Sequence, residues 1–157
     1  MPRDIETNSH GKSTAQIDLY GEYHFKVDSK GRVSLPSKFR KCLANNLLVS
    51  REPQDSCLYV FTAKTFKAWI EQLFIDKFGG YDSSNRQHVL LRSKLNRRVD
   101  SVGVDSSGRI MLKADFREAV GIGKEVVIVG NTGYFEIWNP DKLAQEDENV
   151  DLSVLFK

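Results

Sequence analysis

Two aspartate–arginine pairs with identical spacing are the residues of this chain best suited to bind a charged partner. Asp28 stands four residues before Arg32, and Asp105 stands four residues before Arg109. Across a tight turn, the carboxylate can hold the guanidinium as a fixed fork that donates to a phosphate or to a guanine edge. The pair can equally do no more than stabilise its turn, since an exposed ion pair is worth only about 0–1 kcal/mol. The spacing leaves both interpretations open.

Each pair belongs to a loop of the form Asp-Ser-x-Gly-Arg. Gly31 and Gly108 supply the positive φ that the turn requires, and the aspartate side chain can accept hydrogen bonds from the turn's own amides. Lys30 and Lys38 lie close by in the first loop. Amides beside Gly31 could also donate to a phosphate. The loop therefore has the residue types of an anion site.

The two loops lie in two copies of one longer segment. Residues 27–43 read VDSKGRVSLPSKFRKCL, and residues 104–120 read VDSSGRIMLKADFREAV, at a constant offset of 77. At the same offset, LYVF at 58–61 falls on FEIW at 135–138. We interpret the repeat as the duplication of one structural unit, and we expect the fold to have a pseudo-two-fold axis.

Hydrophobic patterning predicts the elements that position these loops. Each copy reads as strand, turn, strand, short helix, strand and strand. In the first copy these are strands over 17–27 and 33–35, a helix from 36 or 37 to 43, and strands over 47–50 and 58–61. In the second copy they are strands over 102–104 and 110–112, a helix over 114–120, and a hairpin of 125–129 with 133–138. Between the copies we expect an amphipathic helix over 65–78 and a second helix, capped by Ser83 or Ser84, that runs to about residue 98.

One unit of this size cannot easily bury its own apolar faces, whereas two units that pair strands across the axis can form a small barrel with few free edges. The sequence therefore predicts an α+β fold, mostly β, in which two tandem half-units form a pseudo-two-fold β-barrel with inserted and terminal helices. The expected segments are a disordered extension over 1–16, a first repeat with its appended helix over 17–80, a linking helix over 81–99, a second repeat over 100–143 and an acidic C-terminal segment over 144–157.

Composition argues against several classes of protein. No apolar run approaches the roughly 18 residues of a membrane span, and the polar N-terminus is unlike a signal peptide. The cysteines, Cys42 and Cys57, have neither metal nor redox spacing, so we expect a cytoplasmic protein with reduced thiols. His10, His24 and His88 are scattered, without carboxylate or cysteine partners at ligand spacing. With no nucleophile, Walker or dinucleotide motif, we expect no enzyme, metal, cofactor or small-molecule substrate.

The net charge of +2 conceals an asymmetry. Residues 136–151 hold six acids and one base, whereas residues 26–41 hold six bases and one acid. A local basic face suits a polyanion partner, although a solvated face is the common alternative. Residues 83–98 also carry five bases and no acid, and they too could be a second nucleic-acid surface or a solvated helix face.

The quoted motifs resemble the MraZ family of bacterial transcriptional regulators. The resemblance rests on YGEYHFKVDSKGRVSLPSKFR at 20–40, VDSSGRIML at 104–112, VIVG at 127–130 and FEIW at 135–138. It implies an AbrB-like swapped-hairpin fold and a ring-shaped homo-oligomer. It also implies binding of double-stranded DNA at short direct repeats upstream of the division and cell-wall gene cluster, usually as a repressor, and hence a cytoplasmic, nucleoid-associated protein.

On this resemblance, the DNA-facing residues fall on both loops. The first loop contributes Lys30 and Arg32, with Lys38 nearby, oriented by Asp28 and Gly31. The second loop offers the counterparts Arg109, Asp105 and Gly108, but Ser107 replaces the lysine, and Lys113 replaces Pro36. We therefore expect the first loop to be the stronger DNA contact.

A second class of function is a non-catalytic, ring-forming scaffold that binds a protein partner. Such a scaffold would assemble through the same barrels, with the acidic C-terminal stretch as a contact. The two hypotheses differ in one measurable property. A DNA-binding protein loses affinity steeply with salt and on Arg32→Ala, whereas a scaffold is indifferent to both.

Overall fold

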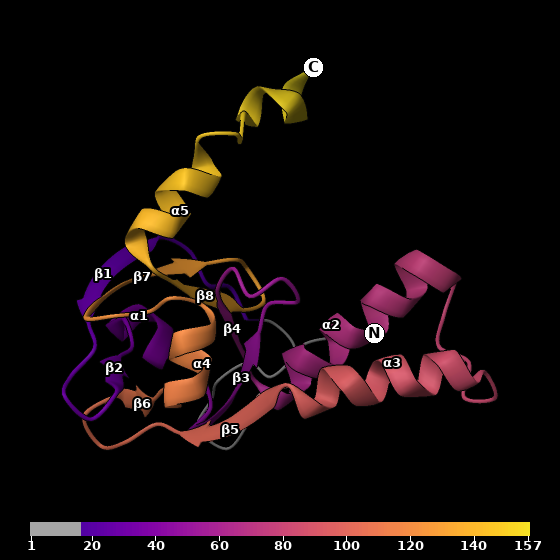
Figure 1. The fold of residues 1–157 in the computed structure, drawn as a ribbon, viewed down its shortest axis with the longest axis horizontal. Coiled ribbons are helices and arrows are strands. Elements are labelled where there is room, and N and C mark those ends of the chain that lie inside the picture. Colours follow the sequence, from indigo (N-terminus) through magenta and orange to yellow (C-terminus); the bar gives the residue numbers. More distant parts are fainter. Residues whose placement is uncertain (1–16) are drawn as a thin grey trace, which may run out of the picture.

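Strands form one body in the computed structural model, and two helical parts project from it in different directions (Figure 1). The structure describes residues 17–157, so the extension predicted to be disordered over 1–16 lies outside the described residues. The strands are β1 (Glu22–Lys26), β2 (Arg32–Ser34), β3 (Asn46–Arg51), β4 (Leu58–Phe61), β5 (Val99–Gly103), β6 (Arg109–Met111), β7 (Glu125–Gly130) and β8 (Phe135–Trp138). The helices are α1 (Ser37–Arg40), α2 (Ala63–Phe78), α3 (Arg86–Arg97), α4 (Ala114–Ala119) and α5 (Pro140–Asp147), followed by a 3-10 helix, η1 (Leu152–Phe156).

Both sheets combine strands of the two copies. One six-stranded sheet has the order β1-β7-β8-β4-β3-β5, and a two-stranded ribbon pairs β2 with β6. All these pairs are antiparallel. The first strand of each copy therefore pairs with the third strand of the other copy, which is the exchange that defines a swapped hairpin. The predicted α+β, mostly β fold of two swapped half-units is confirmed.

The strand registers obey a pseudo-two-fold axis. The axis passes between Val33 and Ile110, which face each other at the centre of the β2–β6 ribbon. It also passes between Tyr59 and Glu136 at the centre of the β4–β8 pair. The duplication seen in the sequence is therefore a symmetry of the folded chain.

Away from the axis, the pairing of β1 with β7 reappears as the pairing of β5 with β3. Glu22 lies opposite Val129, and the corresponding pair is Val99 opposite Ser50. Because α4 is longer than α1, β7 follows β3 by two residues more than the 77-residue offset of the other strands. The β7–β8 turn is shorter than the β3–β4 loop, which restores the offset at β8. The registers survive these compensating changes in length.

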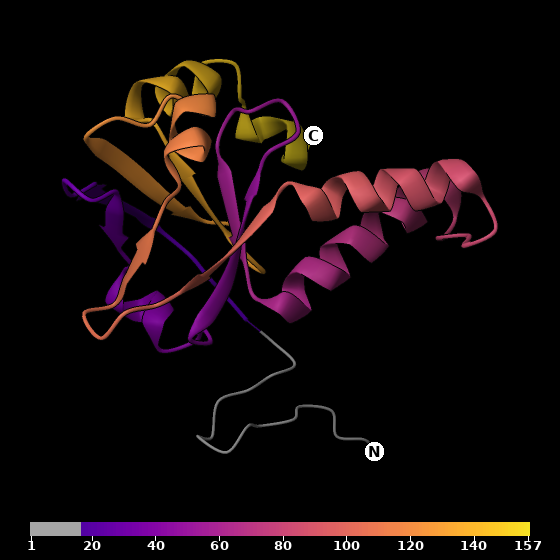
Figure 2. The same ribbon diagram turned by 60° about the horizontal axis from the view of Figure 1, so that its bottom comes forward.

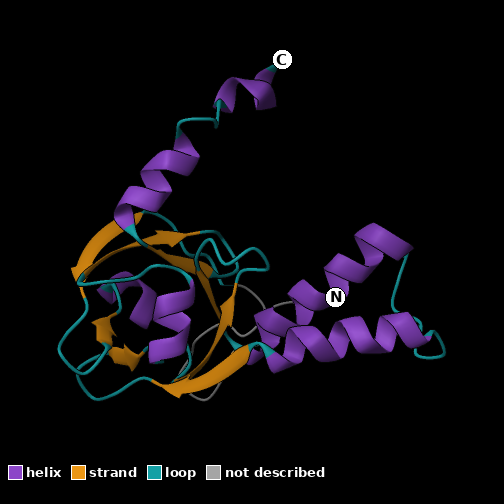
Figure 3. Cartoon of the chain, in the orientation of Figure 1, coloured by secondary structure: helices purple, strands orange, loops and turns teal. Residues whose placement is uncertain are grey.

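One apolar core fills the space between the sheet and the ribbon. Val33 and Ile110 point inward from the ribbon with exposed fractions of 0% and 1%. Phe39 of α1 and Phe116 of α4 are buried in the same cluster, which contains residues of both copies. Each half therefore completes the core of the other, as expected for units too small to bury their own apolar faces. Figure 3 shows α1 and α4 lying against the strands of this body.

The strand and helix ends differ from prediction where local turns intervene. β1 begins at Glu22 and not at residue 17, because Gly21 has φ 97° and separates it from the bridge between Leu19 and Thr132. Helix α1 stops at Arg40 because its chain continues as a tight turn, in which the amide of Cys42 donates to the Phe39 carbonyl at 3.0 Å.

Helices α2 and α3 form a hairpin that projects beside the strands, and β5 follows directly from α3 (Figure 2). Helix α2 starts two residues before the predicted Thr65, because Thr62 and Thr65 form a capping box. Helix α3 is capped by Asn85, so the predicted caps, Ser83 and Ser84, were wrong. Ser84 instead donates its amide to the side chain of Asp82 in the turn before the helix.

The C-terminal part of the chain is helical. The side chain of Asn139 caps α5 by accepting from the amides of Asp141 and Lys142, and Pro140 occupies the first helical turn. Asp151 then caps the 3-10 helix η1. Across the described range 17–157, no helix is both long and apolar enough to cross a bilayer.

Candidate nucleic-acid interface

The first Asp-x-x-x-Arg loop is locked by its own aspartate. Asp28 Oδ1 accepts from the amides of Lys30 at 2.9 Å and Arg32 at 2.8 Å, and its Oδ2 accepts from Arg32 Nε at 2.8 Å. The backbone closes the turn with Gly31, whose φ is 86°, donating to the Asp28 carbonyl at 3.0 Å. One carboxylate thus fixes both the turn and the arginine.

The second loop repeats this geometry at equivalent positions. Asp105 Oδ1 accepts from the amides of Ser107 and Arg109 at 2.9 Å each, and Oδ2 accepts from Arg109 Nε at 3.0 Å. Gly108, with φ 77°, donates to the Asp105 carbonyl at 2.9 Å. The aspartate and the glycine therefore have the same hydrogen bonds and backbone geometry in both turns.

These hydrogen bonds favour the ionised form of both carboxylates. The pKa of Asp28 lies below its usual value, chiefly because the Arg32 amide donates to it, with a further contribution from the Arg32 side chain. The pKa of Asp105 is lowered in the same way, chiefly by the Arg109 amide, while burial opposes the shift and the Ser107 amide adds to it. Both loops therefore remain charged and intact at neutral pH.

The two arginines share the outward face of the β2–β6 ribbon. Side chains alternate across a strand, and Val33 and Ile110 point inward, so Arg32, Ser34, Arg109 and Met111 point outward. Met111 is 44% exposed. The sequence placed the two loops far apart, but the exchange of strands brings them to one surface.

The two arginines differ in their terminal nitrogens. Arg109 Nη1 lies 3.7 Å from Asp28 Oδ2, so Arg109 interacts with the carboxylates of both loops. Arg32 is bonded through Nε to Asp28, and within residues 17–157 no protein partner contacts its Nη atoms. Arg32 therefore presents two oriented donors to an incoming ligand, whereas the guanidinium of Arg109 is also attracted by the carboxylate of the first loop.

Each loop is also covered by an arginine from the helix of the other copy. The Arg117 guanidinium lies over Gly31, where an added Cβ would stand 2.9 Å from Nη2, and Arg117 Nε donates to the Leu112 carbonyl at 3.0 Å. The Arg40 guanidinium lies over Gly108, where an added Cβ would collide with it. Sequence reasoning did not include Arg40 and Arg117 among the site residues, although their recurrence at the 77-residue offset was a signal that could have found them.

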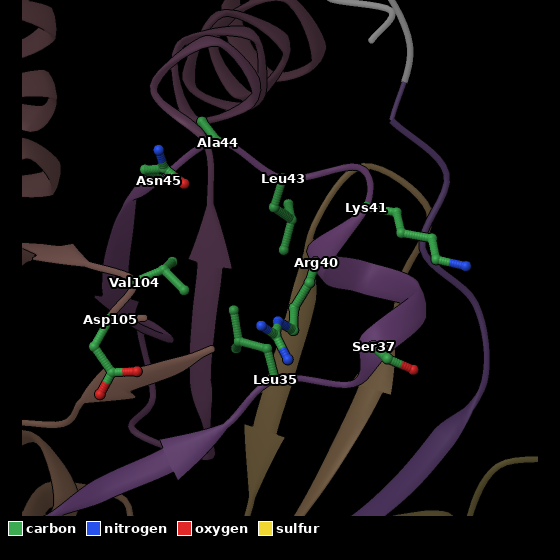
Figure 4. Close-up of a pocket in the computed structure, with 9 residues that line it drawn as sticks. All are labelled: Leu35, Ser37, Arg40, Lys41, Leu43, Ala44, Asn45, Val104 and Asp105. Carbon is green, nitrogen blue, oxygen red and sulfur yellow. The ribbon is translucent and has the colours of Figure 1, made fainter. Parts of the chain in front are cut away.

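A hollow of about 400 Å³ lies between α1 and the start of the second loop. In Figure 4, Leu35 and Leu43 point into this hollow, whereas Lys41 extends away from it. Arg40 and Asp105 lie on its border. The hollow therefore connects the basic helix of the first copy with the loop of the second copy.

Charge distinguishes the surroundings of the two loops. Lys30 of the first loop and Lys38 of α1 are both exposed. Their counterparts at the 77-residue offset are Ser107 and Asp115. The first copy therefore carries two lysines at positions where the second copy has a serine and an aspartate.

The other basic stretch is partly used by the protein's own contacts. The Arg92 guanidinium lies 3.7 Å from the centre of the Tyr81 ring. Arg98 donates to the Glu52 carbonyl at 3.0 Å and pairs with Asp55 at 3.2 Å. These contacts favour a structural role for both arginines. In the described part of the chain, no group of three or more histidine, cysteine or acidic side chains is placed to hold a metal ion.

Fold and site together define a class of protein: a tandem swapped-hairpin chain that carries two Asp-x-x-x-Arg turns on one outward ribbon. The chain belongs to the MraZ family. The family model described as "MraZ protein, putative antitoxin-like" matches residues 19–79 and 97–152, which leaves out most of α3. The resemblance stated from the motifs is therefore confirmed.

Relatives from several bacteria share most of the chain. A protein of Saccharopolyspora erythraea is 35% identical over 122 residues, covering 78% of this chain and 81% of the relative. A protein of Mycobacterium ulcerans is 39% identical, with coverages of 76% and 79%. A protein of Caldicellulosiruptor bescii is 35% identical, with coverages of 87% and 91%. Each is named "Transcriptional regulator MraZ", a name that indicates no catalytic family.

Proposed function

We propose that this chain is a sequence-specific, DNA-binding transcriptional regulator. Relatives that cover most of the chain bear the name of transcriptional regulator. The single observation that carries the proposal is how Arg32 is held. Asp28 accepts from its Nε at 2.8 Å, and the residue lies on the outward face of the ribbon. Within residues 17–157, its Nη atoms form no hydrogen bond or ion pair with the protein. A guanidinium fixed in this way loses little side-chain entropy on binding.

The proposed contact follows from this geometry. The two Nη atoms of Arg32 donate to the O6 and N7 acceptors of a guanine in the major groove, or to two oxygens of one phosphate. Lys30 and Lys38 neutralise neighbouring phosphates from exposed positions on the same copy. Asp28 and Gly31 take no part in the contact themselves; they hold the turn that aims the arginine.

The second loop has a supporting role in this proposal. Arg109 faces the same surface, oriented by Asp105 and Gly108, but its Nη1 lies 3.7 Å from Asp28 Oδ2, and Ser107 stands where the first loop has Lys30. It therefore contributes a weaker contact than Arg32. The exposed guanidinium of Arg40 lies over the second loop and adds positive charge there.

We further propose a ring-shaped homo-oligomer that binds short direct repeats upstream of the division and cell-wall gene cluster, as a repressor, in the cytoplasm at the nucleoid. Counterion release grows with the number of phosphates neutralised, so one subunit with a few basic side chains binds weakly. Linked copies of the loop raise affinity by about 10²–10⁴. Neighbours in a head-to-tail ring are related by rotation in one sense, which matches direct repeats spaced by about one helical turn.

Selection of bound duplexes from a random pool, followed by gel shifts with the selected sequence, tests this proposal. We expect binding that weakens steeply with salt and that is lost in Arg32→Ala. Arg97→Ala removes an exposed arginine of α3 and serves as the matched control, with binding retained. A protein that ignores duplexes at low ionic strength favours the scaffold hypothesis, and a footprint over an inverted repeat contradicts the ring.

A further inference from the structure

An apolar groove of about 560 Å³ runs between the projecting helices α2 and α3. Three of its lining side chains are well exposed for large apolar residues: Leu73 at 39%, Phe78 at 43% and Leu91 at 39%. Contiguous exposed apolar surface is typical of an interaction site, not of a monomer's free surface. Its complete lining is Pro53, Leu73, Phe74, Lys77, Phe78, Leu91, Lys94, Leu95 and Arg98.

The groove is not needed to hold the hairpin onto the body. Phe66 and Ile70 of α2, which do not line the groove, are buried in a cluster with Phe61 of β4 and attach the hairpin to the body. The rim of the groove is basic, with Lys77, Lys94 and Arg98 among its residues. Arg98 is already paired with Asp55, so the two lysines provide the free positive charge. The surface therefore suits a segment that is both apolar and acidic.

The C-terminal segment of the same chain has that composition. Its apolar side chains are almost fully exposed: Leu152 at 68%, Val154 at 69%, Leu155 at 76% and Phe156 at 83%. In a 3-10 helix, residues three apart lie above one another, so Leu152 and Leu155 form a single apolar ridge along η1. The acids that precede or cap this ridge are Glu146, Asp147, Glu148 and Asp151.

The segment does not fold back onto its own groove. Helix α5 is fixed at its first turns, where Lys142 Nζ donates to the Asp55 carbonyl at 2.7 Å and Leu143 packs against the cluster of Val127 and Trp138. From this anchor the helix carries η1 away from the body, in a different direction from α2 and α3 (Figure 1). Groove and tail therefore stand at separate places, each exposed.

We propose that the C-terminal segment 147–156 of one subunit docks between α2 and α3 of a second subunit, with the Leu152–Leu155 ridge in the groove and the acids against Lys77 and Lys94. This contact rests on the self-association proposed above and names the surfaces that mediate it. It is heterologous, because each subunit offers a tail at one place and a groove at another. A heterologous contact whose rotation closes produces a ring, as the proposed self-association requires.

The molar mass of the full chain, measured by light scattering without DNA, tests the contact with matched pairs of variants. Leu155→Asp places a charge on the ridge, and Ser153→Asp adds the same charge to η1 away from it. Leu91→Asp places a charge in the groove. Leu90→Asp places the same charge at an exposed apolar position of α3 that does not line the groove. We expect both ridge and groove variants to fall to the 17.9 kDa of one chain, and both controls to retain the mass of the unaltered protein.

Mixing the two disrupted variants identifies the occupant. Leu155→Asp keeps an intact groove and Leu91→Asp keeps an intact tail, so the mixture should form a one-to-one dimer although neither variant associates alone. A mixture that stays monomeric, a Leu155→Asp variant of unaltered mass, or an unaltered protein that is itself monomeric overturns the proposal. If Leu91→Asp alone dissociates the protein, another part of the second copy occupies the groove, and the tail is excluded.

The same samples separate this inference from the DNA-binding proposal. Arg32→Ala should retain the mass of the unaltered protein, because Arg32 is distant in sequence from both surfaces and belongs to the ribbon. Loss of duplex binding with unchanged mass then concerns the loop alone. If the unaltered protein binds duplexes but is a monomer, the tail contact is wrong and the proposed role of Arg32 is unaffected.

Discussion

The two Asp-x-x-x-Arg loops have the same backbone and different surroundings. In both, the aspartate accepts from two amides and from the arginine Nε at 2.8–3.0 Å. Yet the first copy carries Lys30 and Lys38, whereas the second copy has Ser107 and Asp115 at the same positions. The fold makes the loops equivalent, and individual side chains make them unequal.

This difference teaches that a duplicated motif need not be a duplicated function. The hydrogen bonds of each loop serve its turn, so they persist wherever the turn is needed for folding. Positive charge around the turn serves only a polyanion partner, so it can be lost from one copy at no cost to the fold. Charge is therefore the feature that distinguishes the two copies in the proposed contact with DNA.

The largest effect should come from removing each arginine in turn. We expect Arg32→Ala to lower duplex affinity by about 100-fold or more, since one bidentate contact to guanine is worth about 1–3 kcal/mol and the loss recurs in every linked subunit. We expect Arg109→Ala to lower it by about tenfold, because its positive charge is already partly balanced by Asp28 as well as Asp105. Fluorescence anisotropy measures the duplex affinity of both variants, and an unchanged molar mass shows that self-association is intact. Equal losses of affinity would contradict the proposed difference between the two loops.

Giving the second loop the charges of the first should raise affinity. In Ser107→Lys with Asp115→Lys, two added cations stand at the positions of Lys30 and Lys38. We expect binding about tenfold tighter, with a log–log salt slope steeper by roughly one for each new phosphate contact. The reverse exchange in the first copy, Lys30→Ser with Lys38→Asp, should weaken binding, and an unchanged slope in both exchanges would show that neither helix faces the phosphates.

Alanine at the loop glycines should destabilise both copies, and the first copy more. Both glycines have positive φ, which costs about 1–2 kcal/mol for an L-residue. A Cβ at Gly31 also stands 3.2 Å from the Leu112 carbonyl, which is backbone, whereas at Gly108 it meets the movable guanidinium of Arg40. Urea denaturation should therefore give a lower free energy of unfolding for Gly31→Ala than for Gly108→Ala, and the opposite order would contradict this account.

The smallest effect concerns pH. The folded-state pKa values of Asp28 and Asp105 lie below the usual value of 3.8. Their contribution to stability is therefore present above pH 3.8 and is lost as the pH falls from there through the folded pKa values. Denaturation at pH 7 and pH 3 should show a smaller acid-induced loss in Asp28→Asn and Asp105→Asn than in the unaltered chain. The change should be greater for Asp28→Asn, because Asp28 also attracts Arg109.

Local chemistry explains what could be predicted from the sequence. The repeat, the turn glycines and the alternation of apolar residues act over a few neighbouring positions, so the order of strands and helices in each copy followed from them. Errors arose where several local signals competed: Asn85 caps α3 in place of Ser83 or Ser84, and Gly21 interrupts the first strand. The aspartate–arginine geometry was also predictable, because both partners belong to one turn.

The sequence by itself determined the two loops, their bend and their unequal charge, since each depends on residues that are neighbours along the chain. Only the tertiary structure decided that both arginines face one surface, that Arg109 reaches Asp28, and that Arg40 and Arg117 each cover the loop of the other copy. These contacts join segments from opposite halves of the chain. They exist because the strands are exchanged across the pseudo-two-fold axis, and that exchange is set by the burial of a shared core and not by any local pattern.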